Sequence, residues 1–124
     1  MIKGLGIDLV KIERFKNIIE RWGNKFLERV FTPAELDYCR DSINYPERLA
    51  ARFAAKEAAF KMLEGTARGV GWHDFEVNNT AKGRPQLFLR GKAARLAEEK
   101  GIVFIHLSLS HERDFAIAQV IGEG

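Results

Sequence analysis

Three side chains at two separated places in the sequence could together bind a metal ion and a phosphate. Asp8 lies in GLGIDLV near the N-terminus, and Glu57 and Lys61 lie four residues apart in RFAAKEAAFK. Two carboxylates are too few to enclose Ca²⁺, but they suit Mg²⁺, which keeps several waters and takes other ligands from a substrate phosphate. Lys61 would then act as a positive point charge for the phosphate.

Each of these residues also has an ordinary structural interpretation. Glu57 and Lys61 share a helix face, where a solvated ion pair is worth roughly a few tenths of a kcal/mol, and Asp8 could end a strand or cap the next helix. The alanines around Glu57 favour a site, because a carboxylate on a closely packed helix needs a partner more demanding than water. Considered together, Asp8 and Glu57 indicate a metal site.

A second group of polar side chains lies on one predicted strand. His106, Ser108 and Ser110 alternate with aliphatic residues over residues 102–110, so they share one face. That face is either exposed to solvent or lines a site, whereas His111 in the following turn is more often structural. The sequence contains no Walker loop, GxGxxG, HExxH or Ser-His-Asp order, so nucleotide-binding loops and hydrolase triads have no support.

The first strand and helix must position Asp8. Residues 2–10 alternate with the period of a half-buried strand, with Gly4, Gly6 and Asp8 on one face. Two glycines beside an aspartate leave room for something to approach. A helix is predicted over residues 11–22, where the apolar positions recur at helical spacing: Ile12, Phe15, Ile19 and Trp22.

Two more helices follow in the first half. Thr32, Pro33 and Glu35 predict a capping box at the start of a short helix that ends near Asp41. Residues 44–47 repeat this start signal, and the long alanine-rich helix that follows is predicted to run to Leu63 and to stop at Gly65.

The second half of the chain alternates short strands with one helix. Because strands joined by hairpins favour antiparallel pairing, we expect an α+β fold in which a mainly antiparallel sheet packs against the long helix, as a single domain over residues 1–124. The predicted elements are strands at 72–78, 85–89, 102–110 and 115–121, and a helix at 91–100.

The composition limits the cellular compartment and the kinds of partner that we expect. The single cysteine, Cys39, excludes an intrachain disulfide and a cysteine metal cluster. No stretch resembles a signal peptide or approaches the ~20 apolar residues of a membrane span, so we expect a soluble cytoplasmic protein with no membrane partner. The net charge of +3 favours an anionic partner, and the basic excess is concentrated between Lys11 and Arg29.

Several segments resemble the holo-acyl-carrier-protein synthase family of phosphopantetheinyl transferases from end to end. The strand motif GIDxV followed much later by FAAKEAxxK is a specific combination, whereas either motif alone would only be suggestive. The matching segments are GLGIDLVKIERF from Gly4, FTPAEL from Phe31, RFAAKEAAFK from Arg52, DFEV from Asp74, KGRPQL from Lys82 and HLSLSHERDFAIAQVI from His106.

The resemblance implies a reaction and a metal. Asp8 and Glu57 would hold Mg²⁺ against the pyrophosphate of coenzyme A, and Lys61 would contact the same phosphates. A serine of an apo acyl carrier protein would attack the β-phosphate, and 3′,5′-ADP would leave. A metal-bound water and Glu57 are both candidates for the proton acceptor, and the sequence does not choose between them.

The resemblance also implies where the nucleotide end of coenzyme A binds. The family commonly has lysine where Arg84 stands, which keeps the positive charge. The family assembles as trimers with sites between subunits, and the alanine-rich faces of so small a chain would suit this. No functional role is assigned to residues 65–71. The positions that match the family's nucleotide subsite are Arg52, Gly83, Arg84, Pro85, His106 and Ser108.

The basic first helix then has a specific use. Arg14, Ile18, Arg21 and Lys25 follow at spacings of four, three and four, which predicts a cationic stripe with an apolar centre for an acidic carrier protein. A merely solvated basic face is the alternative. Docking through this stripe should weaken with salt.

Two other functions compete. A small nucleic-acid-binding module would explain the basic helix, but it leaves Asp8, Glu57 and the polar strand face without a role. A non-catalytic binder of coenzyme A or carrier protein would keep the fold, although intact Asp8, Glu57 and Lys61 argue against it. The sequence does not decide between fatty-acid and polyketide carriers, between Mg²⁺ and Mn²⁺, or whether acylated coenzyme A is accepted.

Overall fold

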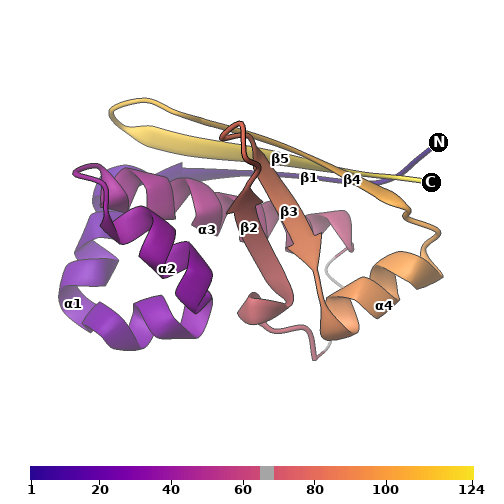
Figure 1. Cartoon of the computed structure of the whole chain (residues 1–124), viewed down its shortest axis with the longest axis horizontal. Coiled ribbons are helices and arrows are strands. Elements are labelled where there is room, and N and C mark those ends of the chain that lie inside the picture. Colours follow the sequence, from indigo (N-terminus) through magenta and orange to yellow (C-terminus); the bar gives the residue numbers. More distant parts are fainter. Residues whose placement is uncertain (65–68) are drawn as a thin grey trace.

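A three-stranded antiparallel sheet lying across a long helix forms the centre of the computed structural model, which describes residues 1–64 and 69–124 (Figure 1). The strands β1 (Ile2–Lys11), β4 (Phe104–His111) and β5 (Phe115–Glu123) pair in the order β1-β5-β4, so the two terminal strands are neighbours. The helix α3 (Tyr45–Met62) packs against the sheet.

The remaining elements gather around α3 in two groups. The helices α1 (Ile12–Val30) and α2 (Pro33–Arg40) lie toward one end, and a second antiparallel hairpin and a short helix lie toward the other (Figure 1). The predicted α+β fold is therefore confirmed. The other elements are the 3₁₀ turn η1 (Trp72–Asp74), β2 (Phe75–Asn79), β3 (Pro85–Leu89) and α4 (Gly91–Glu99).

Two glycines allow β1 to lie directly on α3. A Cβ atom on Gly6 would overlap the carbonyl oxygen of Ala58, and one on Gly4 would lie 2.5 Å from the carbonyl oxygen of Met62. The space that the sequence leaves beside Asp8 is thus filled by the backbone of α3. This contact brings the Asp8 strand against the Glu57 helix.

The apolar side chains of β1 point away from α3. Leu5, Ile7 and Leu9 are each more than half exposed, and none of the described helices covers this outer face of the sheet (Figure 1). Phe104 and Phe115 on the neighbouring strands are also exposed. The glycine side is buried instead, because Gly4 and Gly6 lie where the backbone of α3 leaves no room for a Cβ. A patch of this kind marks an interaction surface.

The first helix differs from its prediction. It continues past Trp22 to Val30, and Gly23 interrupts it with φ 57° and ψ −140°. Ile12 and Phe15 are buried as expected, but Trp22, at the break, is 58% exposed instead of packing in the core. The regular spacing predicted from Arg21 to Lys25 was wrong, since it crosses this non-helical residue.

The helix starts are confirmed in part. At α2 the hydroxyl of Thr32 accepts from the backbone N–H of Glu35, and a carboxylate oxygen of Glu35 accepts from the N–H of Thr32 at 2.9 Å. At α3, Pro46 lies in the first turn, but the side chain of Asn44 accepts no capping hydrogen bond. The predicted stop at Gly65 falls outside the described residues.

Candidate functional site

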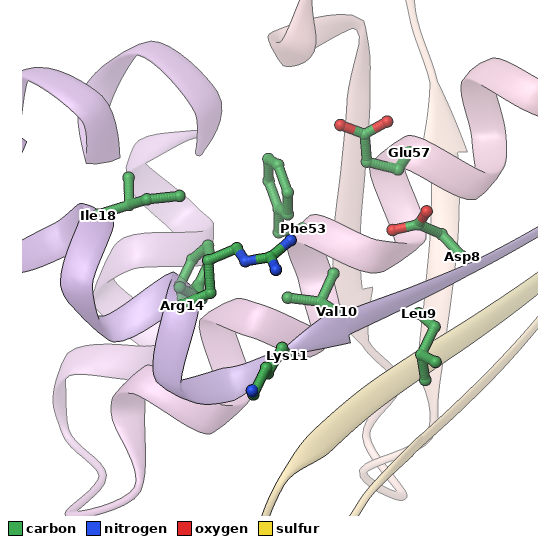
Figure 2. A pocket seen from close by; sticks show the side chains of 9 residues that line it. Asp8, Leu9, Val10, Lys11, Arg14, Ile18, Phe53 and Glu57 are labelled. Carbon is green, nitrogen blue, oxygen red and sulfur yellow. The ribbon is translucent and has the colours of Figure 1, made fainter.

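The contact between β1 and α3 brings Asp8, Glu57 and Lys61 together. The ammonium of Lys61 lies 3.3 Å from a carboxylate oxygen of Asp8 and donates to the carbonyl oxygen of Ile7 at 2.9 Å. The carboxylates of Asp8 and Glu57 lie beside one another and line the same groove (Figure 2). The residues predicted from the sequence therefore form one cluster.

Electrostatics in this cluster favour a cation. Burial raises the pKa of Glu57, the charge of Asp8 raises it further, and Lys61 opposes both effects. Two carboxylates that repel each other are stabilised by a cation placed against both. No set of three or more metal-ligating side chains is found in the part of the chain that the structure describes. Two hard oxygen donors with most ligand positions left open fit Mg²⁺, which retains waters and binds phosphate.

A groove of about 270 Å³ extends from these carboxylates to α1. Arg14 and Ile18 of α1 line its far end, and Phe53 of α3 forms a wall between them and Glu57 (Figure 2). Phe53 was not among the site residues predicted from the sequence. Its spacing of four residues from Glu57 was the signal that it shares the site's helix face.

The other half of the predicted stripe lies beyond the groove. Arg21 and Lys25 are exposed, and neither lines the groove that contains Arg14 and Ile18. The break at Gly23 separates them, so the four residues do not form one helical face. Arg14 and Ile18 therefore form a cationic and apolar end of the groove, whereas Arg21 and Lys25 are separate basic side chains beyond it.

Arg52 is a buried cation without a carboxylate partner among the described residues. It is 4% exposed, and its guanidinium donates to the side-chain oxygen of Asn79 at 2.8 Å and to the carbonyl of Arg48 at 3.3 Å. Its Nε finds no hydrogen-bond partner in the described part of the chain. A buried charge normally has a counter-charge, so this position is suited to an anion.

The turn at residues 83–85 is linked to Arg52. The side-chain nitrogen of Asn79 donates to the carbonyl of Gly83 at 2.9 Å while its oxygen accepts from Arg52. Gly83 adopts φ 82°, which favours glycine. Arg52 and the turn that carries Arg84 and Pro85 therefore form a second group.

His106 and Ser108 form a third group, on the exposed outer face of the sheet. His106 Nε2 lies 2.9 Å from a carboxylate oxygen of Glu123, and this hydrogen bond lowers the pKa of Glu123. Asp8 faces α3 on the opposite side of the sheet, where it contacts Lys61. Within a single chain, the outer-face residues and the carboxylates of Asp8 and Glu57 do not share a pocket among the described residues.

Comparison with known proteins shows to which family the chain belongs. The family model for the 4′-phosphopantetheinyl transferase superfamily matches residues 4–120. A holo-[acyl-carrier-protein] synthase of Halothermothrix orenii is 50% identical over 123 residues, which cover 99% of this chain and 98% of that protein. The chain belongs to the 4′-phosphopantetheinyl transferase superfamily.

Solved structures agree with the fold of this transferase. The holo-[acyl-carrier-protein] synthase of Neisseria meningitidis is 32% identical with a TM-score of 0.85 and full coverage of both chains. The Helicobacter pylori synthase in complex with coenzyme A is 32% identical with a TM-score of 0.83, and 96% of this chain and 99% of that one are covered. The resemblance drawn from the sequence is thereby confirmed.

The transferase also contains a buried ion pair that the sequence did not reveal. Lys56 and Glu35 lie 2.7 Å apart, and neither side chain is exposed. Glu35 was predicted only as a capping residue. No local pattern connects it to Lys56, because the two residues meet only when α2 packs on α3.

Proposed function

We propose that this transferase moves the 4′-phosphopantetheine group of coenzyme A to a serine of an apo acyl carrier protein. The observation that carries the proposal is the groove in which two carboxylates, Asp8 and Glu57, lie at one end and Arg14 lies at the other. Metal-assisted phosphate chemistry and recognition of an acidic protein would then occur side by side. The names of the similar proteins support this assignment.

In this proposal Asp8 and Glu57 hold Mg²⁺, which, when bound, neutralises charge on the pyrophosphate. Lys61, tied to Ile7 and Asp8 by its ammonium group, adds positive charge beside the same phosphates. The serine oxygen forms a bond to the β-phosphorus and its proton passes to Glu57 or to a water at the site. The bond from that phosphorus to the bridging oxygen breaks, and 3′,5′-ADP leaves with the electron pair. Positioning and charge neutralisation supply most of the rate.

We assign the nucleotide end of coenzyme A to the other two groups of residues. Arg52 offers a buried guanidinium without a carboxylate, and the Gly83-Arg84-Pro85 turn is attached to it through Asn79. His106 and Ser108 would come from a neighbouring copy, since they lie on the outer face of the sheet. The apolar part of that face supports a homotrimer with sites between subunits.

The carrier protein would dock on α1. Arg14 and Ile18 lie at the groove, where they would meet the acidic partner near its reacting serine. Arg21 and Lys25 add positive charge farther along, on either side of Gly23.

We also place the reaction in the cytoplasm and in fatty-acid synthesis, and the single buried thiol of Cys39 suits a reducing compartment.

Release of 3′,5′-ADP as a function of Mg²⁺ tests the metal assignment. We expect no release without a divalent cation, and a loss of about 100-fold or more in kcat/KM for Asp8→Asn and for Glu57→Gln. Glu98→Gln, which neutralises an exposed carboxylate on α4, should behave as the unsubstituted protein. Full activity of both site variants would remove these residues from the metal site.

A further inference from the structure

The buried Lys56–Glu35 pair uses every polar atom that it has. Besides its 2.7 Å contact with Glu35, Lys56 Nζ donates to the carbonyl of Val30 at 2.8 Å and to that of Trp72 at 3.1 Å. The second oxygen of Glu35 accepts from the backbone N–H of Val77 at 2.8 Å. The pair therefore connects α3 to α1, α2, η1 and β2.

Such a pair is not explained by stability alone. A buried ion pair can often be replaced by apolar residues of similar volume without loss of stability, because removing two charges from water is costly. What apolar residues cannot reproduce is the direction of the hydrogen bonds. Those bonds fix where the end of α1 lies relative to α3.

The part of α1 after Gly23 depends on contacts from other elements for its position. Gly23 breaks the helix, so residues 24–30 do not continue the axis set by Ile12 and Phe15. Three side chains from other elements hold this segment. Arg40 donates to the side chain of Asn24 at 3.4 Å, His73 to the carbonyl of Glu28 at 2.8 Å, and Lys56 to the carbonyl of Val30.

Lys56 is the member of this trio that belongs to α3. It immediately precedes Glu57, so one helix carries both a metal-site carboxylate and the ammonium that holds the end of α1. Donors at the final carbonyl groups also suit the negative end of a helix dipole. The segment thus held carries Lys25 and Arg29, both exposed.

We infer that Lys56, with Glu35 as its counter-charge, is a positioning residue for carrier recognition. It sets the place of residues 24–30 relative to Glu57, so that a carrier bound along α1 presents its serine to the groove. The inference rests on the proposed function. Binding of coenzyme A does not depend on this segment, because the residues assigned to it lie on other elements.

The test is steady-state kinetics of the double variant Glu35→Gln/Lys56→Met, which removes both charges with little change in volume. We expect KM for the apo carrier protein to rise by about tenfold, the scale of a lost interface contact. KM for coenzyme A should stay within about twofold. Equal changes in both constants, or no change in either, would overturn the inference.

If the double variant does not fold, a single substitution at the surface provides the test. His73 is exposed, so His73→Ala removes one support of the segment at the surface. We expect a smaller rise, confined again to the carrier KM, and an unchanged carrier KM would contradict the inference.

Ile102→Ala controls for general destabilisation. Ile102 belongs to the core cluster that contains no residue of α1 or α2, so a cavity there should leave the ratio of the two KM values unchanged. A shifted ratio in this control would overturn the assignment to Lys56. Failure of the proposed function is a separate outcome, because the unsubstituted protein would then transfer nothing.

Discussion

At the scale of single residues, the surroundings of Glu57 disfavour its ionised form when no cation is bound. Burial and the charge of Asp8 both act against its ionised form, with Lys61 as a partial counterweight. The two carboxylates therefore repel each other in the protein alone, and a divalent cation bound to both would remove that repulsion.

Proton and metal should compete at Glu57. Because its pKa is raised above the ordinary value of 4.5, lowering the pH toward that raised value protonates a carboxylate that Mg²⁺ needs unprotonated. We expect the Mg²⁺ concentration for half-maximal turnover to increase steadily from about pH 7 to about pH 5. A Mg²⁺ requirement that stays constant over this range would show that Glu57 is not a ligand.

Glu76 should contribute to stability in acid. Burial raises the pKa of this carboxyl, but hydrogen bonds from Thr32, Asn78 and Arg90 outweigh burial and hold it below 4.5. The unfolded chain then binds more protons than the native one as the pH falls below 4.5, so stability is present above that pH and is lost through the lowered folded pKa.

Urea unfolding of Glu76→Gln checks this contribution. The variant should be less stable than the unsubstituted protein at neutral pH, by about 1–3 kcal/mol for a buried hydrogen-bonded group, and the difference should shrink as the pH falls below 4.5. A difference that does not change with pH would contradict the assigned role.

At the scale of elements, the contact between β1 and α3 creates the proposed metal site. Asp8 reaches Glu57 and Lys61 only because Gly4 and Gly6 let the strand rest on the helix backbone. The alanines of α3 complete the contact, since Ala54 and Ala58 are fully buried. The positions of these three side chains therefore depend on glycines and alanines, which carry no polar side-chain groups.

Gly6→Ala tests this dependence. Its added Cβ would overlap the carbonyl oxygen of Ala58, so we expect a loss of about 1–3 kcal/mol in the free energy of unfolding. Gly71→Ala is the matched control, because a Cβ there meets no atom of the described residues within 4 Å. Equal stability of the two variants, measured by urea unfolding, would disprove the close contact.

The elements also show where sequence reasoning succeeds and fails. The capping box at Thr32 and the alternation of β4 are local patterns, and both appear in the structure as predicted. The buried face of β1 and the break at Gly23 were not predictable, because packing against α3 and a single backbone conformation decide them. Asp8 and Glu57 were predicted to lie together from the glycines and alanines around them and from the family motifs that contain them, and the structure places the two side chains in one groove.

At the scale of the whole molecule, the uncovered apolar face of the sheet is the dominant feature. It carries exposed leucine, isoleucine and phenylalanine side chains beside His106 and Ser108. If a second chain covers this face, the polar residues reach a site that their own chain does not complete. Assembly and catalysis would then depend on each other.

Ile121→Lys on β5 tests this dependence by placing a charge on the outer face. We expect the unsubstituted protein to sediment as a trimer, and the variant to remain folded but dissociate and lose transfer activity, since an unpaired charge buried in an interface is costly. Val103→Lys is the control, because Val103 is 71% exposed and lies outside the strands. A trimeric, active Ile121→Lys protein would show that this face is not the interface.

The most direct test of the central claim is intact-mass spectrometry of an apo acyl carrier protein incubated with coenzyme A, Mg²⁺ and this protein. We expect a gain of one phosphopantetheine group on the carrier, and no gain with Asp8→Ala, with Glu57→Ala or without metal. No gain with any acidic carrier, although the protein is folded and metal is present, would contradict the transfer and return the basic helix to the nucleic-acid alternative.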